Sequence, residues 1–193
     1  MSRRKKARRK GRLLLAFALV ALICLLFFRC GSGGVAETIF PRKYAVLIEH
    51  YAAENQLPAD LVYAIVYCES GFDPDAVSSV GARGLMQLME PTFDWVKNGL
   101  DGEEDTVYDD MFDPKTNLKY GCRLLGLLLQ EYETIPNALC GYHAGWGITR
   151  QWLEDPQYAP DGKNIENIPY DDTASYVKKV MRTAEIYREL YHL

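Results

Sequence analysis

One glutamate, Glu69, stands at the end of the apolar run "LVYAIVYC" (residues 61–68) and is followed by a stretch rich in Gly, Pro, Asp and Ser. The apolar spacing predicts a helix that ends at Glu69, because Gly71 is a typical stop signal after a helix. Apolar surroundings and the negative end of the helix dipole both disfavour a carboxylate, so both raise the pKa of the Glu69 side chain. A carboxyl group that is protonated near neutral pH can act as a general acid. The alternative is a solvated glutamate in the last turn of a surface helix.

The elements that must position this carboxyl group are helical almost throughout. Apolar residues at helical spacing predict helices over 42–55, 58–69, 91–96, 114–132 and 171–191. The segment "NALCGYHAGWGITRQWL" predicts two shorter helices, broken by Gly145 and Gly147. No strand of useful length is predicted, although a small hairpin fits within 77–88. The pattern therefore predicts an all-α domain.

The longest apolar stripe lies in the segment 114–132, where seven residues recur at helical spacing: Leu118, Cys122, Leu124, Leu125, Leu127, Leu128 and Leu129. This segment is predicted to be the central buried helix. The acidic segment 101–113 holds seven Asp and Glu residues and is predicted to be a surface loop. It lacks the spacing and the final glutamate of an EF-hand calcium loop, so no metal site is predicted there.

Charge is distributed unevenly along the chain. Residues 1–34 contain nine Lys and Arg and no acid, which leaves 13 of the 22 basic residues and all 26 acidic residues in 35–193, a formal charge of −13. An acidic body is not suited to nucleic acid, because the neutralisation of phosphates needs clustered Lys and Arg. No nucleic-acid partner is therefore expected.

The N-terminal segment predicts a membrane anchor. Eight basic residues precede an uncharged apolar run at 13–28, which spans about 24 Å as a helix, against a hydrocarbon core of about 30 Å. Arg12 and Arg29 can extend toward the two interfaces and close the gap. The basic flank predicts a single-pass protein of the cell membrane, with a cytoplasmic N-terminus and an extracytoplasmic body. A cleaved signal peptide, with a site near Gly34–Ala36, is the alternative.

Five cysteines are too few for a disulfide scaffold. Cys24 and Cys30 lie in or beside the apolar run, while Cys68, Cys122 and Cys140 lie in helical patterns and are expected to be small, buried apolar residues. A thiol enzyme that uses Cys140 and His143 would need a further orienting group, and no motif supplies one.

Three ordered blocks resemble the family 1 lytic transglycosylases, which are related to goose-type lysozyme. The block "ESGFDPDAVSSVGARGLMQLM" (69–89) matches the family's Glu-Ser, Phe-x-Pro-x-Ala-x-Ser and Gly-Ala-x-Gly-Leu-Met-Gln pattern. "ALCGYHAGWG" (138–147) is similar to its Ala-Leu-x-x-Tyr-Asn-Ala-Gly block, and "IPYDDTASYVKKV" (168–180) to its Ile-Pro-x-x-Glu-Thr-x-x-Tyr-Val block. The resemblance implies a lysozyme-like helical fold over most of 56–182.

The resemblance also implies a role for each matching residue. Glu69 would be the single catalytic acid and base, and Tyr142 would approach it. Ser78 would bond near the N-acetyl group of the substrate. The remaining substrate-binding candidates are Gln87, Met89, His143 and Tyr176, of which Tyr176 would form the far wall of the cleft. For Gln87, Met89 and the two tyrosines, packing in the core or satisfaction by the backbone is the alternative interpretation.

Three departures from the family pattern concern the site. His143 stands where the family usually has Asn, and Asp172 stands where it often has Glu. Pro91 directly precedes Thr92, whereas the family usually places a residue between them. We expect His143 to replace an amide hydrogen bond or to serve as an additional base.

Most glycosidases use two carboxyl groups, but no second acid of this sequence lies in a recognisable catalytic motif. Asp73 and Asp75 are predicted to be solvated residues of the turn. One carboxyl group suffices if it protonates the leaving oxygen and then deprotonates the sugar's own 6-hydroxyl, which closes a 1,6-anhydro ring. The resemblance implies this reaction on the MurNAc–GlcNAc bond of peptidoglycan, without metal or cofactor. A hydrolytic muramidase and a non-catalytic peptidoglycan-binding module are the alternatives.

The expected organisation has four parts. They are a cytoplasmic basic segment (1–12), a transmembrane signal anchor (13–28), a linker (29–41) and a lytic transglycosylase catalytic domain (42–193).

Overall fold

The computed structural model describes residues 34–100 and 105–193, and the chain divides into two compact units, Met1–Pro41 and Arg42–Leu193. In the first unit, residues 34–39 are helical, and the Thr38 hydroxyl donates to the Gly34 carbonyl at 2.8 Å. These residues were expected to form part of a flexible linker. The predicted membrane span at 13–28 lies outside the described residues. Within the described ranges, no helix combines the length and apolar character that a membrane crossing requires.

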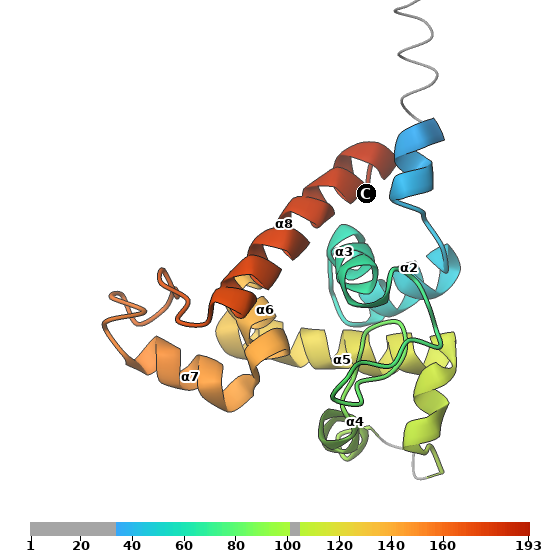
Figure 1. Ribbon diagram of the computed structural model, residues 1–193. Helices are drawn as coiled ribbons and strands as arrows, with labels where there is room; N and C mark the ends of the chain where they lie inside the picture. Colours follow the sequence, from blue (N-terminus) through green and yellow to red (C-terminus); the bar gives the residue numbers. More distant parts are fainter. Residues whose placement is uncertain (1–33, 101–104) are drawn as a thin grey trace, which may run out of the picture. The chain divides into compact units, whose positions relative to one another are not determined.

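The second unit is built from helices (Figure 1). Its elements are α2 (Ala45–Glu54), α3 (Ala59–Ser70), α4 (Glu90–Lys97), the 3₁₀ helix η1 (Tyr108–Phe112), α5 (Pro114–Tyr132), α6 (Ile135–Ala144), α7 (Trp146–Glu154) and α8 (Asp171–Tyr191). Within residues 34–100 and 105–193 the structure contains no strand, and the expected hairpin is reduced to two isolated bridges, Val77–Arg83 and Arg83–Leu88. The prediction of an all-α domain is confirmed for these residues.

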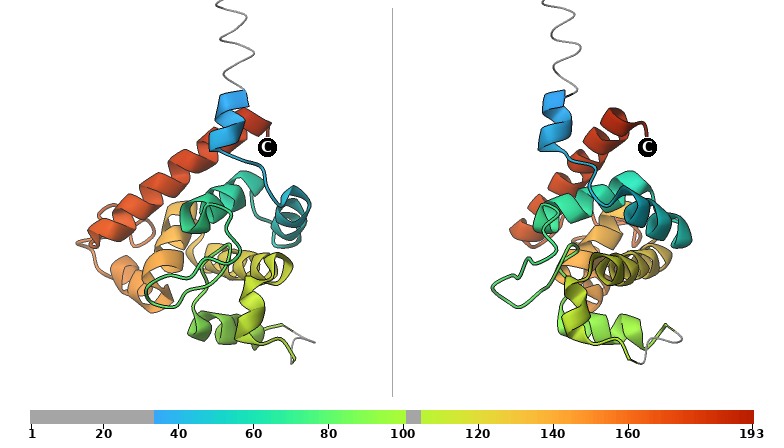
Figure 2. Two further views of the ribbon diagram at one scale, coloured as in Figure 1. Left: turned by 45° about the vertical axis from the view of Figure 1, so that its right-hand side comes forward. Right: turned by 90° about the vertical axis from the view of Figure 1, so that its right-hand side faces the viewer.

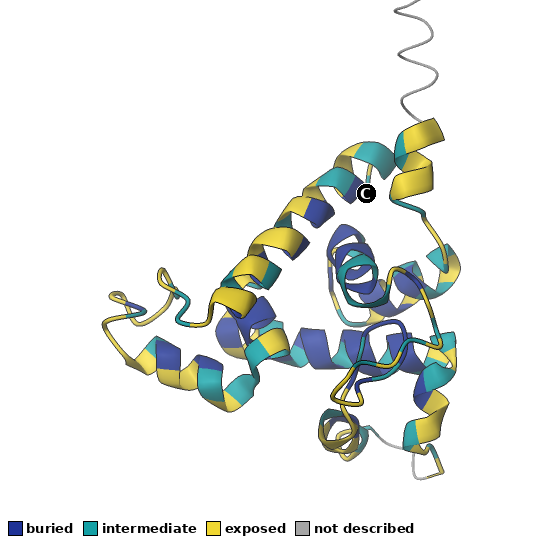
Figure 3. Cartoon of the chain, in the orientation of Figure 1, coloured by how far each residue is buried: buried dark blue, intermediate teal, exposed yellow. Residues whose placement is uncertain are grey.

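Helix α5 is the buried centre of the second unit, as predicted. It contacts α2, α4, α6 and η1. Its buried residues include Leu118, Cys122 and Leu125, whereas Leu129 is half-buried. Figure 3 shows buried positions concentrated on α3 and α5, with exposed positions along one side of α8. The burial of so much apolar surface on one helix explains why the other elements gather around it.

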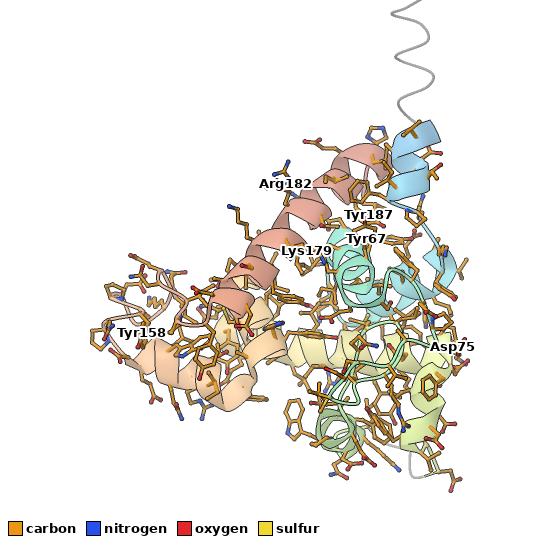
Figure 4. All side chains as sticks on the ribbon, viewed as in Figure 1. Tyr67, Asp75, Tyr158, Lys179, Arg182 and Tyr187 are labelled. Atoms are coloured by element: carbon orange, nitrogen blue, oxygen red, sulfur yellow. The ribbon has the colours of Figure 1, made fainter. Side chains whose placement is uncertain are left out.

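Helix α8 runs along α3 and α6, as the views of Figures 1 and 2 show. Tyr187 stacks on Tyr63 with ring centroids 5.2 Å apart and lies edge-on to Tyr67 at 6.4 Å (Figure 4). Asp60 near the start of α3 is 3% exposed and accepts a 2.7 Å bond from Arg188 Nε. These contacts fix the register of the two helices, so that α8 passes the end of α3 where Glu69 lies.

Two local features of the chain differ from what the sequence predicts. Gly145 separates α6 from α7 as predicted, but Gly147 lies within α7 and does not break it. The segment expected as an acidic surface loop contains η1, whose Met111 side chain is fully buried. Burial of Met111 outweighs the polar character of its neighbours and ties this segment to α5.

Candidate active site

Glu69 is the second-last residue of α3, and Gly71 ends that helix in the left-handed region with φ of 61°. A residue without a side chain adopts this conformation at little cost, so the chain can turn away immediately after the carboxyl group. Burial raises the pKa of Glu69, while a hydrogen bond from Tyr176 and the charge of Lys179 act in the opposite direction and offset it only in part. The upward shift of the Glu69 pKa agrees in direction with the sequence prediction.

The closest polar partner of Glu69 comes from α8. The Tyr176 hydroxyl donates to Glu69 Oε1 at 2.7 Å. Burial and the nearby Glu69 charge raise the pKa of Tyr176, so Tyr176 keeps its proton and remains a donor. Lys179 lies one turn further along α8 (Figure 4), and its ammonium group donates to the Cys68 carbonyl at 3.4 Å. Tyr176 therefore orients one carboxyl oxygen.

Tyr142 lies near Glu69 but does not bond to it. Its hydroxyl donates to the Met86 carbonyl at 2.7 Å, and burial together with the Glu69 charge raises its pKa. The tyrosine that touches the carboxyl group is thus Tyr176, which the family pattern assigned to the far wall of the cleft. Tyr142 instead fixes the loop that carries Met86.

His143 contacts Tyr176 rather than Glu69. The imidazole stacks on the Tyr176 ring with centroids 4.5 Å apart and an interplanar angle of 29°, and its Nδ1 lies 3.0 Å from Thr173 Oγ1. Thr173 is buried, and its amide donates to Asp172 Oδ1 at 2.8 Å. His143 therefore supports the back of the tyrosine that holds the candidate acid.

Ser78 and Gln87 serve the loop between α3 and α4. The Ser78 hydroxyl oxygen accepts the amides of Ala82 at 2.9 Å and Val80 at 3.3 Å. Gln87 Nε2 donates to the carbonyls of Ala76 at 3.0 Å and Gly84 at 2.9 Å. The amide nitrogen of Gln87 is thus satisfied by the backbone, while within the described residues its Oε1 accepts no bond. Met89 occupies the N-cap position of α4, makes no side-chain capping bond there, and is 36% exposed.

Two residues that position this loop have no functional prediction from the sequence. Asn117 is fully buried on α5 and bonds three backbone groups: its Oδ1 accepts from Met86 N at 2.8 Å, and its Nδ2 donates to Arg83 O at 3.0 Å and Met111 O at 2.9 Å. Ser70 donates to Leu85 O at 2.8 Å. The sequence could have indicated the role of Asn117, because an Asn on the buried side of an apolar helix must find hydrogen-bond partners for its amide.

Cys68, Cys122 and Cys140 are free, and burial raises the pKa of each thiol. Raised thiol pKa values argue against a thiolate nucleophile. Across residues 34–100 and 105–193, no three His, Cys, Asp or Glu side chains are grouped so as to hold a metal ion.

A cavity of about 410 Å³ opens beside Tyr142. It lies between α4, α5 and the junction of α6 with α7, and its walls include Trp95, Trp146, Leu124 and Leu128.

Comparison with known proteins places the chain in a family. The sequence model of the transglycosylase SLT domain matches residues 46–165. The chain belongs to this family. The soluble lytic murein transglycosylase of Escherichia coli strain K12 is 31% identical over 156 residues, which are 79% of this chain and 24% of that protein. The membrane-bound lytic murein transglycosylase C of Actinobacillus pleuropneumoniae serotype 5b (strain L20) is 28% identical over 171 residues, 76% of this chain and 46% of that protein.

Solved structures show the same fold for this SLT domain. The 70 kDa soluble lytic transglycosylase of E. coli superposes with a TM-score of 0.74 at 28% identity, covering 81% of this chain and 26% of the other. An inactive mutant of the lytic transglycosylase Slt of Pseudomonas aeruginosa gives a TM-score of 0.70 at 32% identity, covering 79% of this chain and 25% of the other. The chain thus spans about a quarter of the length of these two solved structures and of the E. coli relative, and just under half of the A. pleuropneumoniae relative. Its fold is that of the SLT domain in the solved structures.

Proposed function

We propose that this chain is a lytic transglycosylase that cleaves the MurNAc–β-1,4–GlcNAc bond of peptidoglycan, with Glu69 as its only acid and base. The observation that carries the proposal is the environment of Glu69, a carboxyl group whose pKa is raised by burial and whose Oε1 is held by Tyr176 at 2.7 Å. The names of the relatives, lytic murein transglycosylases, support the same substrate.

In the proposed reaction, protonated Glu69 donates its proton to the glycosidic oxygen as the bond breaks. The resulting carboxylate is stabilised by the Tyr176 hydroxyl and the positive charge of Lys179, which favour the ionised form. That carboxylate then removes the proton of the 6-hydroxyl of MurNAc, whose oxygen attacks the anomeric carbon. The product ends in a 1,6-anhydro ring, and Glu69 regains its proton.

The sequence supports a mechanism with one carboxyl group. Retaining and inverting glycosidases use a second carboxyl group about 5–10 Å from the first. Asp73 and Asp75 follow Glu69 in the turn, and no catalytic motif of the sequence supplies a second acid. This favours intramolecular attack over attack by an activated water, and so disfavours the muramidase alternative.

The other predicted residues are proposed to bind the glycan strand. The loop residues Ser78, Gln87 and Met89 would contact the sugar beside Glu69, with the unbonded Oε1 of Gln87 as an acceptor for an N-acetyl N–H group. Tyr142, His143 and Tyr176 would form the opposite wall. The apolar run at 13–28 is proposed to anchor the chain in the cell membrane as a single-pass helix, with a cytoplasmic N-terminus and the 42–193 body outside.

Two assays test the reaction. Glu69→Gln should lower glycan cleavage at least about 100-fold, because the amide cannot cycle a proton. Glu185→Gln, an exposed glutamate on α8, is the matched control and should retain activity. Retention of activity by the Glu69 variant would remove this residue from its role.

Product analysis separates the lyase from the hydrolase. Digestion of purified peptidoglycan should release fragments whose new ends resist borohydride and are lighter by one water than reducing ends. A hydrolytic muramidase digest provides the reducible reference. Reducible ends from this chain would establish hydrolysis instead, and no cleavage at all with intact binding would favour the non-catalytic module.

A further inference from the structure

The turn at residues 78–82 carries Ser78, a predicted substrate-binding residue, but has little packing of its own. Val80 is 71% exposed, and of the five residues of the turn only Ala82 is buried. The bonds from Ser78 N to Ala82 O and from Gly81 N to Ser78 O shape the turn internally, but they do not fix where it lies. A turn with so little buried surface needs an attachment to another element to keep one position.

The attachment comes from Tyr108, the first residue of η1. Its hydroxyl oxygen lies 2.8 Å from both the Gly81 carbonyl and the Leu88 carbonyl, and its one hydrogen is shared between them. The Leu88 carbonyl also accepts the Arg83 amide, whereas the Gly81 carbonyl has no other partner among the described residues. In this part of the chain, the Tyr108 hydroxyl therefore supplies the hydrogen bond that joins the turn to a helix.

Contacts on the Tyr108 ring fix where its hydroxyl lies. The Arg83 guanidinium carbon lies 4.2 Å from the ring centroid, and Arg83 Nη1 donates to Asp109 Oδ1 at 2.5 Å. On α4, the buried Phe93 has its ring centroid 5.8 Å from that of Tyr108 and 5.0 Å from that of Tyr120 on α5. A cation above the ring and a buried aromatic neighbour together favour one orientation of a tyrosine. Tyr108 thus connects the turn to the core around α5.

The acidic segment that contains η1 has no part in the proposed reaction, but it lies between two elements that matter for the site. Its buried Met111 packs toward α5, and its Tyr108 and Asp109 bond the loop between α3 and α4. The segment therefore bridges the central helix and the loop that carries Ser78. Because this turn has no other hydrogen bond to a helix among the described residues, the bridge determines where the Ser78 hydroxyl lies.

We propose that Tyr108 is a positioning residue that holds Ser78 in place for the glycan strand. The assignment rests on the proposed function, since it takes Ser78 to contact the N-acetyl group of the substrate. Such a contact is present before the reaction as well as in the transition state. Its loss therefore weakens substrate binding and leaves the chemical step at Glu69 nearly unchanged.

Tyr108→Phe tests the proposal, because phenylalanine keeps the ring that contacts Arg83 and Phe93 and lacks only the hydroxyl. In the full chain, in detergent, KM for peptidoglycan strands should rise about 3- to 10-fold, while kcat changes by less than about 2-fold. Tyr158→Phe is the matched control, because the Tyr158 hydroxyl, on the segment after α7, has no hydrogen-bond partner among the described residues (Figure 4). Both constants should keep their parent values in the control. An unchanged KM for Tyr108→Phe would overturn the proposal.

Hydrogen exchange measures the turn directly. The Ser78 amide donates to Ala82 O and the Ala82 amide to Ser78 Oγ, so both are bonded inside the turn. In Tyr108→Phe these two amides should exchange at least about 3-fold faster, while the amides of α5 keep their rates. Unchanged rates in the turn would show that the hydroxyl does not hold it. Faster exchange in the turn with an unchanged KM would leave Tyr108 a purely structural role, and would also refute the proposal.

A double-mutant cycle tests whether Tyr108 acts through Ser78. Ser78→Ala alone should raise KM, and adding Tyr108→Phe to it should raise KM by less than about 1.5-fold more. Fully additive increases would show that Tyr108 affects binding by another route, and would contradict the assignment.

The outcomes separate the two proposals. If the parent chain cleaves no glycan, the proposed function fails. The affinity of the Glu69→Gln chain for a soluble β-1,4-linked N-acetylglucosamine hexamer, measured with and without Tyr108→Phe, then still decides whether Tyr108 supports sugar binding. If the parent chain cleaves peptidoglycan and Tyr108→Phe behaves like Tyr158→Phe, only the positioning role of Tyr108 is refuted.

Discussion

Asn117 is the buried anchor of the loop between α3 and α4, and its removal is the sharpest test of how the site is held. Its side chain bonds the amide of Met86 and the carbonyls of Arg83 and Met111, at distances between 2.8 and 3.0 Å. The Met86 carbonyl in turn accepts the Tyr142 hydroxyl. Loss of the anchor should therefore reduce stability and loosen the wall of the candidate cleft.

The magnitude for Asn117→Ala follows from two backbone groups that lose their partner, the Met86 amide and the Met111 carbonyl, because the Arg83 carbonyl still accepts the Leu88 amide at 3.1 Å. Each buried polar group left without a hydrogen bond costs about 1–3 kcal/mol, with carbonyls toward the low end because they tolerate partial satisfaction. Alanine returns about 0.5 kcal/mol through its better helix propensity. The expected loss is about 2–4 kcal/mol, a large part of a typical stability of about 5–15 kcal/mol.

Urea unfolding of the parent and variant proteins measures this loss, through a lower midpoint at an unchanged m-value. Asn98→Ala, which removes an exposed amide at the end of α4, is the control and should change stability by less than about 0.5 kcal/mol. A loss below about 1 kcal/mol for Asn117→Ala would show that the loop does not depend on this anchor.

Three further predictions concern the same site. Tyr176→Phe removes a hydrogen-bond donor that lowers the pKa of Glu69, so the pKa of Glu69 should rise. The alkaline limb of the pH profile of kcat/KM should then move to higher pH, because Glu69 must be protonated to act as the acid. A move to lower pH would contradict this. Gly84→Ala would place a Cβ 2.1 Å from Met111 O at a φ of +74°, and should cost about 2–4 kcal/mol in urea unfolding. The control Gly81→Ala has φ of +88° but open space, so it carries the backbone strain alone, and equal losses for the two would refute the close contact. Because burial raises the folded-state pKa of Glu69 above its unfolded value, the free energy of unfolding falls as pH rises between those two pKa values. Glu69→Gln should therefore match the parent protein in stability at low pH and become relatively more stable at higher pH. A stability difference that does not change with pH would argue against a raised pKa.

The helical class and the position of the candidate acid could be predicted from the sequence, because both depend on local information. Apolar spacing specified helix α3, whose second-last residue is Glu69, and Gly71 supplied the backbone conformation that ends it. The stripe on 114–132 identified α5 as the central helix, because a helix with such a wide apolar face must be buried. Gly147 was misjudged, because a glycine within a helix lowers helix propensity only modestly and tertiary packing overrides it.

The partner of Glu69 was decided by tertiary structure alone. Tyr176 lies 107 positions after Glu69 in the sequence, and only the packing of α8 on α3 brings its hydroxyl to Glu69 Oε1. The spacing of residues in the sequence does not predict how α8 is aligned against α3. Contacts between the two helices, such as Tyr63 with Tyr187, set this alignment. The pattern therefore named both candidate tyrosines but could not tell which of them touches the carboxyl group.

The same division holds for the loop and the cavity. The sequence predicted Gln87 and Ser78 as site residues, but it did not predict that their polar groups bond the backbone of their own loop. Trp95 and Trp146 lie far apart in the sequence, and they meet only because α4 packs on α5 and α7 packs on α6, which itself packs on α5. Local side-chain chemistry thus determined which helix carries the candidate acid Glu69, whereas long-range packing determined which groups contact its carboxyl group and what lies beside it.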